Sequence, residues 1–178
     1  MRKLTLEELD KSRPDLSEIQ MNPFPIYVVL DNIRSLWNVG SIFRTSDGVR
    51  ISKLYLCGIT GKPPRKEIEK TSLGAEYFVP WEYVENPVDV VKKLKSEGVF
   101  IIVLEQTDKS IDLKKAEIKF PVCMVVGHER IGVADEILEY ADMSVEIPMY
   151  GIKHNLNVAV AFGIAVYELA EKLKNDKN

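Results

Sequence analysis

Short apolar segments alternate along the chain with segments in which apolar residues recur at helical spacing. Six apolar segments predict strands, at Ile26–Leu30, Lys53–Leu56, Tyr77–Val79, Val99–Leu104, Val122–Val126 and Ser144–Ile147. Helices are predicted near Val39–Val49, Pro87–Glu97 and Val133–Tyr140. The fourth and fifth strands are apolar throughout, as expected of strands covered on both faces. The pattern therefore predicts an α/β fold with a largely parallel six-stranded sheet flanked by helices.

The last predicted helix is apolar almost all round. Leu156–Tyr167 contains one strongly polar side chain, Asn157, and beyond Glu168 the pattern becomes amphipathic. A helix that is apolar on every face must be buried on every face. We therefore expect this helix to lie deep within the fold and also to be covered by a second subunit. A buried amide without partners costs about 1–3 kcal/mol, so Asn157 is expected to have specific partners.

The two ends of the chain differ in character. Residues 1–20 are predicted to form an N-terminal arm, in which Thr5 and Glu8 have the spacing of a capping box ahead of a short helix. Residues 21–178 are predicted to form one domain. Within that domain the segment Gly61–Lys70 carries four cations and two prolines. It is expected to be a surface loop, either simply solvated or in contact with phosphates.

Composition narrows the class of protein. A chain of 178 residues that is 46% hydrophobic is neither disordered nor too small for a core. No apolar run reaches the roughly 20 residues of a membrane span, and the N-terminus is too charged for a signal peptide, so a cytoplasmic protein is predicted. Cys57 and Cys123 lie in apolar runs and are expected to be buried reduced thiols. With two histidines and no Cys/His cluster, we expect no metal site. The net charge of −3 argues against non-specific coating of nucleic acid, but not against a local basic patch.

Three polar motifs follow predicted strands. After the first strand, Asn38 is expected to cap a helix, Gly40 permits close approach of another segment, and Arg44 comes six residues after Asn38. That spacing keeps Asn38 and Arg44 off one helix face, although both could line one pocket. Taken alone, these residues favour a simple N-cap and an exposed arginine over a shared functional pocket.

The other two motifs follow the fifth and sixth strands. Gly127, Glu129 and Gly132 form a tight loop that matches neither a dinucleotide fingerprint nor a Walker loop. After Ile147–Gly151, Asn155 is expected to cap the apolar helix. These loops, together with the one after the fourth strand, leave the carboxyl ends of strands, where open α/β sheets bind ligands.

In this order, the motifs N-x-G-x-x-x-R, G-x-E-x-x-G and I-P-M-x-G…L-N-V resemble those of the SpoU (TrmH-like) RNA 2′-O-ribose methyltransferases, which belong to the SPOUT superfamily. The resemblance covers about residues 25–170. It implies a deep C-terminal trefoil knot, a homodimer, S-adenosylmethionine as methyl donor, and a ribose 2′-hydroxyl of tRNA or rRNA as acceptor.

The resemblance also implies roles for individual residues. The expected catalytic residues are Asn38, Arg44, Glu129 and Asn157. The expected cofactor-binding residues are Leu104, Gly127, Ile147, Met149, Asn155 and Leu156. RNA is expected to contact Arg44 and the basic segment through Lys62, Arg65 and Lys66. Where the family commonly has serines in the third motif, this chain has Asn155 and Ala159, and any polar role at position 159 is lost.

Two other interpretations fit parts of the pattern. Loss of the two serines is consistent with a non-catalytic knotted RNA-binding module, although such a module has no reason to keep Asn38, Arg44, Glu129 and Asn157 together. Alternatively, the chain is an unrelated doubly wound nucleotide-binding protein with chance matches. No phosphate-binding fingerprint supports that interpretation.

The family's proposed base is the arginine matched here by Arg44. A guanidinium has a pKa above about 12, and a neighbouring phosphate favours its charged form. We therefore expect Arg44 to clamp the phosphate and to stabilise the developing alkoxide rather than to remove a proton.

Overall fold

The computed structural model describes residues 1–176, and the last two residues of the predicted domain lie outside the described part. Its helices are α1 Leu6–Lys11, α2 Leu16–Met21, α3 Leu36–Val49, α4 Lys66–Ser72, α5 Pro87–Ser96, α6 Asp135–Leu138 and α7 Val158–Asn175, with a 3-10 turn, η1, at Ala75–Tyr77. Its strands are β1 Phe24–Asp31, β2 Ile51–Cys57, β3 Trp81–Val84, β4 Phe100–Leu104, β5 Ile111–Asp112, β6 Val122–Val126 and β7 Met143–Glu146.

The strands form one sheet in the order β3-β2-β1-β6-β4-β7-β5, and every neighbouring pair is parallel. The predicted α/β fold with a parallel sheet is therefore confirmed, but the sheet has seven strands, not six. The additional strand, β5, has only two residues. The strand predicted at Tyr77–Val79 is wrong, because this segment is the end of η1, and the edge strand β3 follows it.

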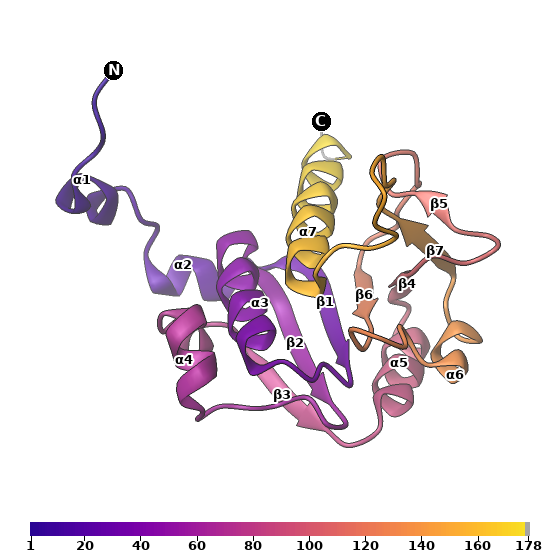
Figure 1. Cartoon of the computed structure of the whole chain (residues 1–178). Coiled ribbons are helices and arrows are strands. Elements are labelled where there is room, and N and C mark those ends of the chain that lie inside the picture. The colour runs from indigo at the N-terminus through magenta and orange to yellow at the C-terminus, as the bar shows by residue number, and fades with distance from the viewer. Residues whose placement is uncertain (177–178) are drawn as a thin grey trace.

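Helices cover both faces of the sheet and create two cores (Figure 1). On one face, α3 and α7 bury Phe43, Phe162 and Val166 against alternate residues of the central strands. On the other face, α5 and α6 bury Val91 and Ile137 against the intervening residues. The central strands are thus covered on both sides, which accounts for their uninterrupted apolar sequences.

The basic segment departs from the loop that was expected. Its second half forms α4, whose Ile68 is fully buried and whose backbone packs against α3. The close approach depends on Gly40, because a Cβ there would lie 2.4 Å from the carbonyl oxygen of Ile68. A charged segment in which only Ile68 is buried lacks the apolar periodicity from which a helix is predicted.

The N-terminal arm begins with the short helix that was expected there. The helix predicted after Thr5 is confirmed as α1, with both hydrogen bonds of the capping box between Thr5 and Glu8. Nothing in α1 is buried, and the arm extends away from the sheet (Figure 1).

Cys57 and Cys123 are free and buried, as expected. Within residues 1–176, no helix is long and apolar enough to cross a membrane.

Candidate active site

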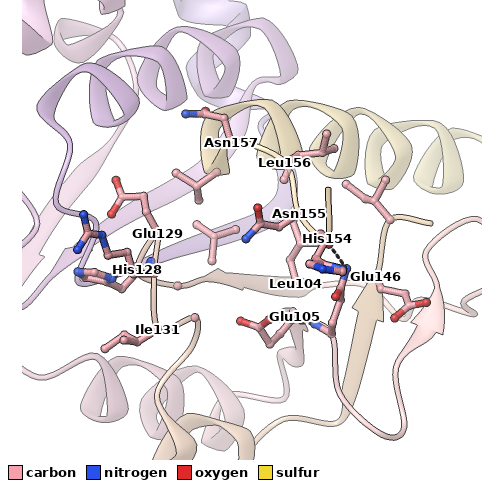
Figure 2. A pocket seen from close by; sticks show the side chains of 18 of the residues that line it. Leu104, Glu105, His128, Glu129, Ile131, Glu146, His154, Asn155, Leu156 and Asn157 are labelled. Carbon is pink, nitrogen blue, oxygen red and sulfur yellow. Dashed lines mark hydrogen bonds between the residues drawn. The ribbon is translucent and has the colours of Figure 1, made fainter. Parts of the chain in front are cut away.

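The loops that follow β4, β6 and β7 meet at the carboxyl edge of the sheet. The registers place Leu30 of β1 beside Val126 of β6, and Leu104 of β4 beside Val145 of β7. A cavity of about 450 Å³ lies between these three loops and the first turn of α7 (Figure 2). It occupies the position at which open α/β sheets bind ligands.

A tight hairpin after β6 holds Glu129 at this cavity. The backbones of His128 and Gly132 exchange two hydrogen bonds, of 3.0 and 2.9 Å. A Cβ at Gly127 would lie 2.2 Å from the carbonyl carbon of Gly132, so only glycine fits there. Gly132 itself has a φ of +74°, in the region that favours glycine. Both glycines of the second motif are therefore required by the backbone of the hairpin.

The carboxylate of Glu129 connects the hairpin to the start of α3. Its oxygens accept hydrogen bonds from the backbone N–H groups of Arg34 and Ser35, both at 3.0 Å, and from Asn38 Nδ2 at 2.9 Å. Burial alone raises the pKa of Glu129, but these hydrogen bonds, with one from its own backbone, outweigh burial and lower the pKa below its usual value. Glu129 is therefore ionised at neutral pH.

A second amide extends this chain of hydrogen bonds to α7. Asn157 Nδ2 donates to Asn38 Oδ1 at 3.1 Å, while Asn157 Oδ1 accepts from the backbone N–H groups of Ala159 and Val160. Glu129, Asn38 and Asn157 thus form one connected set, although they come from three separate parts of the sequence. Asn157 has the specific partners expected of it, but its side chain is exposed rather than buried.

Both predicted helix caps are wrong by a few residues. Ser35, not Asn38, caps α3, with its Oγ accepting from the backbone N–H of Asn38 at 3.4 Å. Asn157, not Asn155, caps α7. In each case a second side chain able to cap lies two or three residues away. Helix-capping propensity does not distinguish between two such residues. The hydrogen bond between Asn38 and Asn157 instead fixes where both helices start.

Arg44 lies apart from this set. It is exposed on α3 and lines a different hollow, together with Asp47, Gly48 and Tyr167. The expectation that Arg44 and Asn38 could line one pocket is therefore wrong within a single chain. No hydrogen bond or ion pair joins Arg44 to another residue of the range 1–176.

The cavity suits S-adenosylmethionine in size and chemistry. Its lining includes all six predicted cofactor-binding residues, Leu104, Gly127, Ile147, Met149, Asn155 and Leu156. The four apolar side chains among them offer a surface for an adenine ring, and its volume falls in the range of small-molecule sites. The carboxylates of Glu105 and Glu146 also line it and favour a cationic ligand. That these residues bind the cofactor stays a prediction.

Two residues of the loop after β4 have roles that the sequence did not assign. Glu105 Oε2 accepts a hydrogen bond from the backbone N–H of Val133 at 3.1 Å, so it anchors the far end of the hairpin. Gln106 Nε2 donates to the carbonyl oxygen of His154 at 2.7 Å and joins two walls of the cavity (Figure 2). Their only sequence signal is their position directly after a buried strand.

The basic segment lies beside the first turn of α3. A Cβ at Gly61 would lie 2.0 Å from Leu36 Cδ2, so the segment touches this turn. Lys62, Arg65 and Lys66 are all exposed. That they contact RNA stays a prediction. In the described part of the chain, no group of three or more His, Cys, Asp or Glu residues could hold a metal ion.

Comparison with known proteins identifies the family. Residues 25–167 match the model of the SpoU rRNA Methylase family. A protein of Aquifex aeolicus (strain VF5) named tRNA (guanosine(18)-2′-O)-methyltransferase is 34% identical over 96% of this chain and 75% of its own length. The crystal structure of the A. aeolicus TrmH/SpoU tRNA modifying enzyme has a TM-score of 0.81, at 31% identity, over 91% of this chain and 84% of that one. An AdoMet-bound rRNA methyltransferase from Sinorhizobium meliloti has a TM-score of 0.79, at 27% identity, over 90% of this chain and 61% of that one.

These matches test three expectations that rested on the motifs, namely the family, the fold and the cofactor. The resemblance is confirmed, and with it the knotted α/β fold of the SPOUT superfamily and the use of S-adenosylmethionine. The interpretation as an unrelated doubly wound nucleotide-binding protein is wrong. By its motifs, its fold and its sequence, the chain belongs to the SpoU rRNA methylase family.

Proposed function

We propose that this chain methylates a ribose 2′-hydroxyl of a tRNA or an rRNA, and that Asn38, Glu129, Asn157 and Arg44 act in that reaction. The observation that carries the proposal is the hydrogen-bonded chain from Glu129 through Asn38 to Asn157 beside the cavity. Three polar side chains from distant segments converge where a methyl donor and an acceptor would meet. The names of the relatives, which include tRNA and rRNA 2′-O-methyltransferases, support the same substrate class.

The cavity would hold the methyl donor. When bound, S-adenosylmethionine supplies an electrophilic methyl group on a positively charged sulfur. Leu104, Ile147 and Leu156 provide apolar walls, and Glu105 and Glu146 provide negative charge. The exposed backbone of the hairpin and of the loop after β7 adds hydrogen-bonding groups.

The two amides are placed to orient the acceptor. Each side-chain amide nitrogen has two N–H groups, and Asn38 and Asn157 each use one of them in the chain of hydrogen bonds. The second N–H of each amide has no partner among the described residues, so it can donate to a ribose oxygen. A donor aimed at the 2′-oxygen stabilises the negative charge that develops as the hydroxyl loses its proton.

Arg44 would act as a clamp on the target phosphate. Its planar guanidinium can form two parallel hydrogen bonds to a phosphate, and its positive charge stabilises an adjacent alkoxide. It would keep its own proton throughout, because a guanidinium holds its proton too strongly to act as a base. The proton of the 2′-hydroxyl would leave to solvent.

A homodimer would bring Arg44 to an active site. Val160, Ile164 and Tyr167 form an apolar stripe along α7, and between 46% and 52% of each side chain is exposed. A second copy covering this stripe would satisfy the expectation that α7 is buried all round. Arg44 lines the same hollow as Tyr167, so a two-fold contact through the stripe would direct it toward the partner. We place this dimer in the cytoplasm, where tRNA and rRNA are found.

The test is methylation of defined RNA. The purified protein is incubated with S-adenosylmethionine carrying a labelled methyl group and with unmodified tRNA or rRNA transcripts. Label in a nuclease-resistant, 2′-O-methylated dinucleotide is the expected result. Asn38→Ala and Glu129→Gln should each lower the rate at least about tenfold, because each removes a hydrogen bond that positions the acceptor. Binding of RNA without any binding of S-adenosylmethionine, measured by calorimetry, would support the non-catalytic module instead.

A further inference from the structure

An exposed tryptophan adjoins the active site but takes no part in its hydrogen bonds. Trp37 lies in the first turn of α3, immediately before Asn38, and 49% of it is exposed. Its backbone carbonyl accepts a hydrogen bond from Thr71 Oγ1 of α4 at 3.1 Å. An exposed indole offers a large flat apolar face, together with one N–H donor, to a binding partner.

A cation lies over this indole, and others precede it on the same segment of the chain. Lys70 Nζ lies 5.5 Å from the centroid of the Trp37 ring, a cation–π contact between α4 and α3. One helical turn earlier on α4, Lys66 is exposed on the same side of the helix. Arg65 and Lys62 precede it on the segment that touches Leu36. Against these four cations, residues 62–70 contain two carboxylates, Glu67 and Glu69, so this segment carries net positive charge.

We propose that Trp37 is a stacking platform for an unpaired base of the RNA substrate, and that Lys66 and Lys70 contact the adjoining phosphates. This inference rests on the proposed function. Every base has a flat face able to stack on an indole, and a lysine beside the ring neutralises the backbone of the stacked nucleotide. The combination of an exposed aromatic ring and flanking cations is the composition by which proteins bind single-stranded nucleic acid.

The position of Trp37 in the fold fits this role. Trp37 directly precedes Asn38 in α3, so a base on its ring would lie next to the ribose that Asn38 and Asn157 orient.

A second copy of this chain is the competing occupant of the ring. The apolar surface that suits a second copy is the α7 stripe, whereas the side chain recorded over the Trp37 ring is a lysine, Lys70. Lysine is depleted in the cores of protein interfaces and enriched where proteins contact phosphates. The charge around Trp37 therefore favours RNA.

Fluorescence of the indole tests the contact directly. The chain has two tryptophans, and Trp81→Phe leaves Trp37 as the only one. A single-stranded RNA oligonucleotide should quench the emission of this variant saturably, because the base stacks on the indole. Inorganic polyphosphate, which offers charge without bases, should leave the emission nearly unchanged. The reciprocal variant, Trp37→Phe, reports only on Trp81 and should show no quenching by either probe.

Kinetics supply a second measurement in the complete enzyme. Trp37→Ala should raise the KM for RNA about tenfold, the loss of one stacked base, while binding of S-adenosylmethionine stays unchanged. Trp37→Tyr should recover most of the loss, since a tyrosine ring also stacks. The matched control is Tyr77→Ala, which removes an aromatic ring that is 76% exposed and has no cation–π contact among the described residues.

The outcomes separate this inference from the proposed function. Quenching by the oligonucleotide supports the stacking site even if no RNA is methylated. Normal methylation by Trp37→Ala, with no quenching in Trp81→Phe, overturns the stacking site and leaves the proposed function intact. Emission that depends on protein concentration but not on RNA, together with a change of sedimentation in Trp37→Ala, assigns the ring to a second copy and overturns the inference.

Discussion

At the scale of single residues, the site depends on a carboxylate that does not need to react. Glu129 accepts hydrogen bonds from two backbone N–H groups and one amide, and these fix the loop before α3 against the hairpin after β6. Its charge also orients Asn38 so that the amide oxygen faces Asn157. We interpret Glu129 as a positioning residue whose ionisation holds two amides in place for the acceptor.

The lowered pKa of Glu129 predicts how stability depends on pH. Because the pKa in the folded state lies below the usual value of 4.5, the stabilising effect of Glu129 is complete above pH 4.5. It is lost as the pH falls through the folded-state pKa and the carboxylate is protonated. The free energy of unfolding of the wild type should therefore exceed that of Glu129→Gln at pH 7, and the difference should shrink below pH 4.5.

Denaturation in urea at a series of pH values measures this difference. Glu139→Gln is the matched control, because Glu139 is exposed at the end of α6 and its carboxylate accepts no hydrogen bond from the described residues. A difference between wild type and Glu129→Gln that stays constant down to pH 3 would contradict the assignment.

Chemical rescue with guanidines tests whether Arg44 clamps a phosphate or removes the proton of the 2′-hydroxyl. Arg44→Ala should lower kcat/KM about 100-fold or more, as for the loss of a charge that stabilises a transition state. Free guanidinium should restore part of the activity, because a cation able to donate two hydrogen bonds can refill the space. Among substituted guanidines, the rescue should follow size and the number of available N–H groups. A rate of methylation that instead tracks the basicity of the guanidine would show that Arg44 removes the proton.

At the scale of elements, the sequence predicted best what is buried on both faces. The strands β1, β4 and β6 were recognisable because their apolar residues face two cores. The edge strand β3 was missed by a few residues, because its side chains are half or fully exposed and the apolar signal lies upstream, at Val79. Helix α4 was missed for a similar reason, since a charged helix with one buried isoleucine has no apolar stripe.

Within the site, the resemblance to the SpoU family implied which residues meet but not how, and within one chain it failed for Arg44. It brought Asn38, Glu129 and Asn157 together, whereas the caps of α3 and α7 fell on other residues than expected. Helix starts are decided by small differences between neighbouring polar side chains, and tertiary contacts such as the one between Asn38 and Asn157 outweigh them. The knot also lay beyond any local pattern, because threading is a property of the whole chain.

Gly40 tests how closely α4 must approach α3. In Gly40→Ala the new Cβ would lie 2.0 Å from Thr71 Oγ1 and 2.4 Å from the carbonyl oxygen of Ile68. Such a clash with backbone outweighs the gain in helix propensity of about 1 kcal/mol, and the net loss of stability should be about 1–3 kcal/mol.

The matched control is Gly163→Ala in α7. There the new Cβ would lie 3.8 Å from Thr45 Cγ2, an ordinary contact, so this substitution should be neutral or stabilising by up to about 1 kcal/mol. Thermal unfolding of both variants measures the difference. Equal melting temperatures would show that α4 can shift without cost.

At the scale of the whole molecule, a single chain does not bring together all the residues of the proposed site. The cavity and the three connected polar residues lie at the carboxyl edge of the sheet, while Arg44 opens onto another hollow beside Tyr167. The helix that was expected to be buried all round instead exposes Val160, Ile164 and Tyr167. The dimer proposed above would explain both facts, because in a two-fold contact through α7 each active site would receive Arg44 from the partner.

Mixed dimers test this explanation. Arg44→Ala and Asn38→Ala are co-expressed with different affinity tags, and only dimers that carry both tags are purified. If Arg44 acts across the interface, one of the two sites in each mixed dimer has both residues intact. The mixed dimers should then have about half the activity of wild type, although each variant alone is nearly inactive. If Arg44 serves its own chain, neither site is intact, and the mixed dimers should be as inactive as their parents.

Ile164→Glu, which places a charge in the apolar stripe, should yield monomers that still bind S-adenosylmethionine but do not methylate RNA. The matched control, Tyr77→Glu, lies outside the stripe and should remain dimeric. Full methylation by monomeric Ile164→Glu would place the whole reaction within one chain.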